Sequence, residues 1–370
     1  MSRKLLFFVE HFNVAAGGAE NVAVHVCRAL SQRGYDVHVA ADTADAVDGI
    51  ALHEGLSRIP EILSAVGPDI TVDWGFFHGA DVHRLGGGIH REFLKSNLAG
   101  CPKFLRWLKR LSYCRGKHRA IIRKEDELIH NREALFVAIS NFVKGQAVRA
   151  GAHPDSVVVL YNGVDTKRFD PEAVRARRAD VRQQWGLAEE DIAFLFVAHN
   201  LRLKNLRLLK RVFDDLSAKQ QRLRLVVIGK RKPAFSAPYL IYAGATGQVE
   251  YAYGGGDALL HPSYFDTFGN VVLEALSCGL PVVVSDQCGA SELIEEGENG
   301  FVLPVTGDGL HIREWSDAVS QLAGDDTLRH SLGAAGRRTA LKHGYETYVD
   351  RFEAYVRQVY ETKAGRSSQR

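Results

Sequence analysis

The amino-acid sequence predicts an α/β protein with two doubly wound domains that face each other across a cleft. The chain has 370 residues, of which 46% are hydrophobic, so it is longer than one ordinary domain and can bury a sizeable core. Strand-like apolar runs alternate with helix-like segments, and this alternation predicts parallel sheets whose strands are joined by helices. A charged segment with few apolar residues separates two series of such runs, which predicts a division into two domains.

The first series predicts an N-terminal Rossmann-like domain over residues 1–164. A helix-like stretch from Glu20 to Arg33 follows the first run, and Gly34 is a typical residue at a helix C-terminus. The apolar runs fall at residues 5–9, 37–41, 70–74, 136–139 and 157–160.

The second series predicts another Rossmann-like domain over residues 191–344. Its apolar runs fall at residues 193–198, 223–228, 258–260, 281–285 and 301–303. Residues 165–190 are charged and contain Pro171, so we expect a linker there. Residues 345–362 have apolar side chains at helical spacing, and we expect this C-terminal helix to cross back and pack on the first domain. Because open parallel sheets bind ligands at the carboxyl ends of their strands, the two domains predict a ligand cleft.

Composition excludes few functions and favours the cytoplasm. Lysine and arginine total 47 against 44 acids, and a net charge of +3 does not by itself indicate nucleic acid or membrane. The five cysteines form neither a metal-binding pair nor a disulfide framework, which is typical of a reduced compartment. The apolar run at residues 5–9 is too short for a signal peptide, and no run approaches the roughly 18 residues of a membrane span. We expect a cytoplasmic protein, or one bound to the cytosolic face of the inner membrane.

Two glycines, Gly17 and Gly18, separate the first predicted strand from its helix. Glycine permits close approach of the backbone to a ligand, and a helix N-terminus offers amide donors to an anion. The loop lacks the GxGxxG pattern of dinucleotide sites. A phosphate-binding turn and a plain tight turn both explain these residues.

A basic pair, Arg202 and Lys204, follows the first strand of the second domain. A guanidinium and an ammonium at a strand's carboxyl end could neutralise a diphosphate leaving group. A solvated basic turn is the alternative, since Arg207, Lys210 and Arg211 follow.

The residues from His261 to Ala275 form the most informative segment. Asp266 falls in a loop after a predicted strand, and a helix begins near Gly269, after Phe268. The first amides of that helix could bind an anion, and they belong to Gly269, Asn270 and Val271. Glu274 lies in an otherwise apolar helix, where an unpaired acid is costly, so it needs a ligand or a partner. A nucleotide ribose and a structural salt bridge both meet that need.

This segment, HPSYFDTFGNVVLEALSCGLPVVVSD, resembles the donor-site signature of the GT-B glycosyltransferases of family 4, an acid followed after seven residues by a second acid. YNGVDTKRF and the glycine loop resemble that family's interdomain segment and N-terminal loop. The resemblance implies a GT-B fold, a nucleotide-sugar donor bound in the second domain, an acceptor bound in the first, and retention of anomeric configuration. It places Glu274 on the ribose, Asp266 on the donor sugar, and Arg202 and Lys204 on the diphosphate. Asp266 replaces the usual Glu, which leaves the identity of the sugar open.

Within the family, the segment after Asp81 and the basic stretch beyond it most resemble lipopolysaccharide core glucosyltransferases. That likeness implies a UDP-linked hexose such as glucose and an acceptor in the lipopolysaccharide core or another surface-glycan precursor. Gly87 stands where those enzymes carry a carboxylate near the acceptor. His83 or His90 would then be the catalytic polar group that faces the sugar, although a lone His is more often structural.

Residues 103–124 form a basic stretch without an acid, and Trp107, Leu108 and Leu111 fall on one helical face within it. An apolar stripe beside cationic side chains is typical of a helix that binds an anionic membrane surface. A solvated helix that packs on the core is a second interpretation. Nucleic-acid binding is a third, which the near-neutral charge and the absence of a recognisable module disfavour.

The sequence has no Asp-x-Asp and no HExxH motif, so we expect no required metal and no cofactor. A sugar phosphorylase, a nucleotide-sugar epimerase and a nucleotide-sugar or lipid binding module without catalysis remain alternatives. The phosphorylase would need a pyridoxal phosphate lysine, and none is identifiable.

Overall fold

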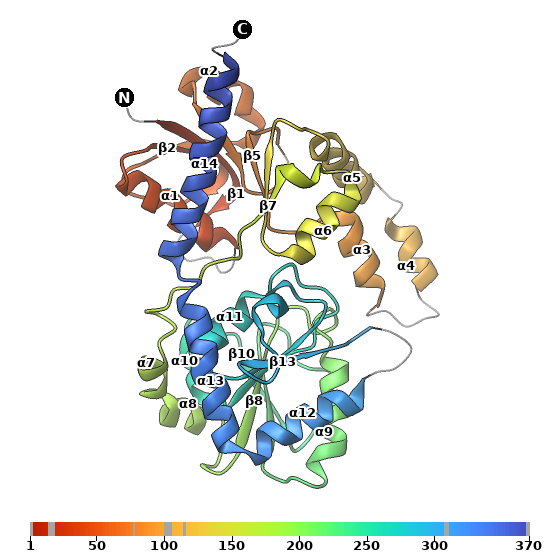
Figure 1. Cartoon of the computed structure of the whole chain (residues 1–370). Coiled ribbons are helices and arrows are strands. Elements are labelled where there is room, and N and C mark those ends of the chain that lie inside the picture. The colour runs from red at the N-terminus through yellow and green to blue at the C-terminus, as the bar shows by residue number, and fades with distance from the viewer. Residues whose placement is uncertain are drawn as a thin grey trace. The chain divides into compact units, whose positions relative to one another are not determined.

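The computed structural model describes residues 3–13, 19–76, 78–99, 106–113, 116–306 and 311–367. The chain divides into two compact units (Figure 1). The first comprises Met1–Leu94, Trp107–Gly163 and Tyr345–Arg370, and the second comprises Lys95–Arg106 and Val164–Gly344. Each unit is built on a parallel sheet, which confirms the predicted pair of Rossmann-like α/β domains.

The described part of the first unit contains a seven-stranded sheet in which every strand pair is parallel. In spatial order the strands are β3 (Ile50–Glu54), β2 (Asp36–Ala44), β1 (Lys4–Phe12), β4 (Ile70–Asp73), β5 (Val82–Leu85), β6 (Leu135–Ala138) and β7 (Val157–Val159). The helices of this part of the chain are α1 (Ala19–Gln32), α2 (Ile59–Val66), α3 (His90–Ala99), α4 (Arg106–Tyr113), α5 (Gly116–Ile129) and α6 (Asn141–Ala150).

The second unit contains a six-stranded parallel sheet in its described residues. In spatial order its strands are β10 (Leu240–Gly244), β9 (Leu223–Ile228), β8 (Ile192–Val197), β11 (Ala258–His261), β12 (Val282–Ser285) and β13 (Gly300–Leu303). Its helices are α7 (Pro171–Arg175), α8 (Arg178–Gln184), α9 (Leu206–Ser217), α10 (Val249–Gly255), α11 (Asn270–Ser277), α12 (Ile312–Gly324) and α13 (Asp326–Leu341).

Residues 165–190, which we expected to form a linker, fold instead into α7 and α8 as part of the second unit. Asp170 caps α7 by accepting hydrogen bonds from the backbone amides of Glu172 and Ala173. Pro171 occupies the first turn of α7, where the missing N–H costs nothing, so it starts a helix and does not break one. Both helices pack against α10 through buried side chains such as Val174.

The C-terminal helix α14 (Tyr345–Ser367) packs on the first unit, against α1 and β4. Tyr348 and Phe352 lie in the core of this unit, and their rings stack with centroids 6.3 Å apart. Arg33 of α1's C-terminal turn donates to Glu353 and Asp350, each at 2.6 Å. Helix α14, at the C-terminal end of the described chain, is therefore part of the same unit as β1.

No helix in the described ranges is both long and apolar enough to span a lipid bilayer.

Replacing Phe352 with alanine should destabilise the first unit by about 3–5 kcal/mol, because it removes a fully buried ring and leaves a cavity. The ring lies 5.7 Å from that of Trp74, and its loss opens the packing between α14 and the sheet. Urea unfolding followed by circular dichroism measures the change. Arg351→Ala, an exposed neighbour on the same helix, should shift stability by less than about 0.5 kcal/mol. Equal effects for the two variants would contradict this packing.

Candidate active site

Asp266 is the centre of the candidate site in the second unit. It lies in the loop that follows β11, and its Oδ2 pairs with the Lys204 ammonium and lies 2.9 Å from His261 Nε2. Burial alone would raise the pKa of Asp266, but the Lys204 charge and the His261 hydrogen bond outweigh it and hold that pKa well below its usual range. Asp266 is therefore a carboxylate at neutral pH.

His261, the last residue of β11, fixes the orientation of this carboxylate. The imidazole is buried, and burial together with the nearby Lys204 charge lowers its pKa although Asp266 opposes the shift. A neutral imidazole carries one N–H, and Nε2 must hold it in order to donate to Asp266. Nδ1 is then a buried acceptor without a hydrogen-bond partner among the described residues.

Gly269 allows the loop to pack tightly behind Asp266. Its φ of 87° lies in the left-handed region, and a Cβ there would come within 2.6 Å of Cys288 Sγ and 3.3 Å of Asp266 Oδ2. Cys288 donates to the carbonyl of Phe268 at 2.9 Å, and burial raises the pKa of its thiol. The side chain of Phe268 is itself buried, so it supports the loop from below.

The loop after β12 holds the Asp266 loop on both sides. The amide of Asp266 donates to the Gln287 carbonyl, and the amide of Gly289 donates back to the Asp266 carbonyl, both at 3.0 Å. Helix α11 then begins at Asn270 without a side-chain cap, a short way along the chain from Asp266.

Within the described ranges, one group of side chains has the spacing of a metal site: His261, Asp266 and Cys288, whose ligand atoms lie within 4.8 Å of one another. The Lys204 ammonium already contacts the Asp266 oxygen that such an ion would use. A divalent cation would have to displace this ammonium, so the arrangement favours the carboxylate–ammonium pair over a metal.

Lys204 and Arg202 belong to the loop between β8 and α9. Among the described contacts of these two residues, only that of Lys204 is with Asp266. Asn205 follows with φ 61°, a left-handed conformation that asparagine adopts more readily than most residues. Arg202 is exposed and donates to Asn97 Oδ1 at 3.0 Å, within the same compact unit.

Glu274, on α11, has a neutral partner. The hydroxyl of Tyr253 on α10 donates to its Oε2 at 2.7 Å, and the described residues offer it no ion pair. Burial raises the pKa of Glu274, while the Tyr253 hydrogen bond and the charge of Arg168 oppose the shift. Arg168 itself pairs with Glu250 at 2.7 Å. The structural salt bridge considered for Glu274 is therefore not seen, and the acid stays available to a ligand.

Two functional side chains, His261 and Tyr253, were not assigned roles from the sequence. His261 stands in the quoted signature directly before Pro262, and its place at a strand end was the available signal. Tyr253 lies on a different helix from Glu274, and no spacing pattern in the sequence joins them.

The two histidines expected to face the acceptor sugar each contact other side chains of the first unit. His83 is fully buried in β5, with Nδ1 3.3 Å from Asp73 Oδ2 and its ring stacked on Phe136. His90 begins α3, and its Nε2 lies 2.9 Å from Nδ1 of His118. Nε2 of His83 has no hydrogen-bond partner among the described residues, and His90 is partly exposed, so their catalytic roles stay a prediction. Gly17 and Gly18 lie outside the described residues.

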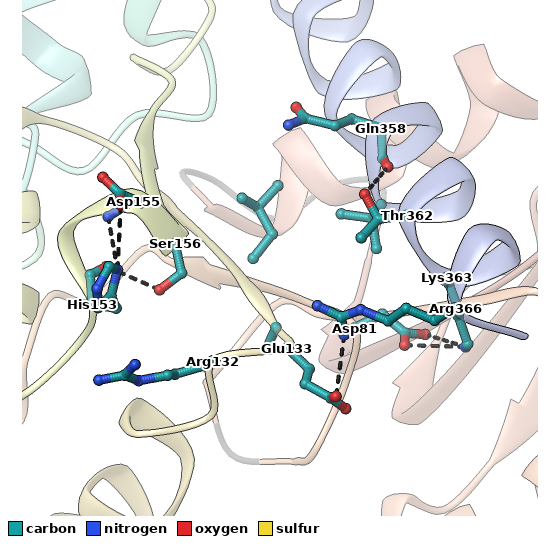
Figure 2. Close-up of a pocket in the computed structure, with 13 residues that line it drawn as sticks. Asp81, Arg132, Glu133, His153, Asp155, Ser156, Gln358, Thr362, Lys363 and Arg366 are labelled. Carbon is teal, nitrogen blue, oxygen red and sulfur yellow. Dashed lines mark hydrogen bonds and ion pairs between the residues drawn. The ribbon is translucent and has the colours of Figure 1, made fainter. Parts of the chain in front are cut away.

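A cavity of about 510 Å³ lies in the first unit, at the edge of the sheet where the amino ends of its strands meet (Figure 2). Its lining residues Asp81, Leu135 and Ser156 stand at the amino ends of β5, β6 and β7. Lys363 of α14 closes one side through a 3.0 Å ion pair with Asp81. Because parallel sheets bind ligands at the carboxyl edge, this cavity is separate from the predicted site.

Residues 177–339 match the family described as "Glycosyl transferases group 1". A D-inositol 3-phosphate glycosyltransferase of Thermobifida fusca (strain YX) is 25% identical over 388 residues, which cover 90% of this chain and 87% of the relative. The chain is a glycosyltransferase. This finding confirms the enzyme class inferred from the acid motif.

Solved structures share the fold of this glycosyltransferase at low identity. The lipopolysaccharide-biosynthesis glycosyltransferase WaaG superposes with a TM-score of 0.76 at 18% identity, covering 94% of this chain and 98% of that one. Anabaena HepE in complex with UDP and glucose gives a TM-score of 0.70 at 16% identity, covering 96% and 99%. The predicted GT-B fold is confirmed.

Removing the Lys204 ammonium should destabilise the second unit by about 1–3 kcal/mol, because Asp266, whose side chain is 17% exposed, would remain as a poorly paired and largely desolvated charge. In the wild type the pKa of Asp266 lies below its unfolded value of about 4, so the pair stabilises above that pH and the effect is lost on acidification through the folded-state pKa. The melting-temperature difference between wild type and Lys204→Met should thus be largest at neutral pH and shrink below about pH 4.

Scanning calorimetry across this pH range measures the difference. Lys210→Met serves as the control, since Lys210 makes an exposed pair with Asp214 four residues away and should change stability by less than about 1 kcal/mol. A difference independent of pH would contradict the assignment of Asp266 as an ionised partner of Lys204.

Proposed function

We propose that this enzyme is a retaining hexosyltransferase that moves a hexose, glucose in the first instance, from a UDP-linked donor to a saccharide acceptor. The acceptor would be the lipopolysaccharide core or another surface-glycan precursor. The observation that supports the donor site is the meeting of Asp266, Lys204 and His261 beside the start of α11, with Glu274 on the same helix.

Each residue of this set has a role that its contacts allow. Glu274, with Oε2 held by Tyr253, would accept hydrogen bonds from the ribose hydroxyls. Asp266 would accept from hydroxyls of the donor sugar. Lys204, Arg202 and the first amides of α11 would stabilise the charge that develops on the departing diphosphate, which is the main electrostatic task in such a transfer.

The relatives' names support a nucleotide-sugar donor and divide on the acceptor. HepE binds UDP and glucose, and WaaG acts in lipopolysaccharide biosynthesis. The Thermobifida fusca relative is named for inositol 3-phosphate, which makes a phosphorylated cyclitol a second candidate acceptor. We propose cytoplasmic activity without a metal or other cofactor, because Lys204 already occupies the carboxylate that a metal would need.

A thermal-shift panel of UDP-, GDP- and ADP-sugars tests the donor. One UDP-sugar should raise the melting temperature through binding to the native state, by the same amount with and without excess chelator. Glu274→Ala should abolish the shift, while Glu190→Ala, an exposed acid of the same unit, should retain it. A shift that requires Mg²⁺ would contradict metal independence, and a normal shift in Glu274→Ala would contradict the ribose assignment.

Turnover in the same samples separates the remaining functions. Transfer with retention, read by NMR from the product's anomeric signal, is the expected result. An inverted product would remove the retaining assignment, release of isomerised sugar nucleotide would identify an epimerase, and donor binding without any turnover would identify a binding module.

We also propose that residues 103–124 hold the enzyme on an anionic membrane surface. In α4, the side chains of Trp107, Leu108 and Leu111 are 60%, 48% and 57% exposed, and Lys109 and Arg110 lie on the same short helix. Three large apolar side chains left in water beside cations are what an interfacial helix presents to lipid. Further basic residues follow on α5: Lys117, Arg119, Arg123 and Lys124.

Flotation with vesicles tests this surface. The enzyme should float with vesicles rich in phosphatidylglycerol and not with pure phosphatidylcholine, since the basic residues need anionic headgroups. Trp107→Ser combined with Leu111→Ser should abolish flotation, whereas Leu341→Ser, which changes a 52% exposed leucine elsewhere, should leave it intact. Equal flotation of both variants would place membrane binding outside α4.

A further inference from the structure

Arg84 is a fully buried cation with no acidic partner among the described residues. Its side chain is on β5, and the residue is 1% exposed. Nη2 donates to Asn162 Oδ1 at 2.8 Å, Nε lies 3.4 Å from the Tyr348 hydroxyl, and Cζ lies 4.9 Å from the centroid of the Trp74 ring. Nη1 is buried without any hydrogen-bond partner. An unpaired buried charge costs several kcal/mol, so this position requires an explanation.

Two other arginines, the buried Arg182 and the half-buried Arg337, show how this chain satisfies a guanidinium. Arg182 donates to several backbone carbonyls and to Asp257. Arg337 likewise donates to backbone carbonyls and to Asp170. Arg84 has neither a carbonyl nor a carboxylate as a described acceptor, so the unused nitrogen is particular to its site.

That site is the carboxyl edge of the first unit's sheet, where ligands bind in folds of this kind. Trp74 directly follows β4, and Asn162 follows β7. A Cβ on Gly86 would lie 2.2 Å from Nη1, so the nitrogen rests against a residue that has no side chain to block it. The next residue, Gly87, is exposed, and none of the described atoms lies within 4 Å of where its Cβ would be. Gly86 therefore packs directly against the guanidinium, and the next residue along the chain borders solvent.

We infer that Arg84 binds an oxyanion, a phosphate or carboxylate carried by the acceptor, at the Gly86–Gly87 turn. A guanidinium presents paired N–H groups that match the oxygens of either group, and an oxyanion supplies the charge that Arg84 lacks. A neutral hydroxyl could accept one hydrogen bond but would leave the charge unpaired. The inference rests on the proposed function, because it takes the first unit as the one that binds the acceptor.

Inorganic phosphate is the probe, and the Trp74 ring beside the guanidinium is the reporter. With saturating UDP present to fill the diphosphate site, phosphate should change the wild-type tryptophan fluorescence saturably. The response should weaken at least tenfold in Arg84→Gln, remain in Arg58→Gln, which alters an exposed arginine of the same unit, and disappear in Trp74→Phe. A response that Arg84→Gln leaves unchanged would overturn the inference.

Kinetics of the wild-type enzyme provide a second test that needs no variant. Phosphate should raise the KM of the acceptor and leave the KM of the donor unchanged. Among probe acceptors, glucose 6-phosphate or glucuronate should exceed glucose at least tenfold in kcat/KM, and their order distinguishes a phosphate from a carboxylate. Equal values for all three would overturn the inference. A donor-induced thermal shift without any phosphate response removes this inference alone, whereas no donor shift at all removes the proposed function.

Discussion

The candidate site depends on keeping one half-buried carboxylate, that of Asp266, ionised. Desolvation opposes this, and the opposition is overcome only because Lys204 and His261 both contact the same oxygen. The loops after β8, β11 and β12 all contribute contacts that hold Asp266 in place. Asn205 takes a left-handed conformation behind Lys204, and Gly269 leaves room that any side chain would fill. The candidate site therefore depends on the loops after three strands, which meet at one charged side chain.

The apolar runs in the sequence predicted most of the described strands but missed β3, β5 and β10, the last although its residues are apolar. Strand β5 was missed because its four residues include His83 and Arg84, and the first of these is buried only through its pairing with Asp73. The helices at residues 165–190 were missed because Pro171 was read as a break, whereas its position after the Asp170 cap makes it a start. Asp266 and Glu274 were found because their spacing is local. Their partners His261 and Tyr253 depend on tertiary contacts that spacing along the chain does not encode.

His83 and Arg84 are buried polar residues on one strand, and their partners differ in charge. They are neighbours on β5, so their side chains point to opposite faces of the sheet. His83 finds a carboxylate within 3.3 Å and an aromatic ring to stack on. Arg84 finds an amide, a hydroxyl and an indole, none of which carries a negative charge. Burial alone ranks the two residues equally, and only the account of their partners separates them.

The position of α14 has a consequence for how the protein is made. Once residue 344 has left the ribosome, every residue of the second unit has been made. The first unit at that point still lacks Tyr348 and Phe352 from its core. The nascent chain thus passes through a stage in which its later domain is closed and its earlier one exposes aromatic surface to chaperones and proteases. A stop codon shortly before residue 345 would leave the second unit folded and would unfold the first unit, which lacks α14 in that product.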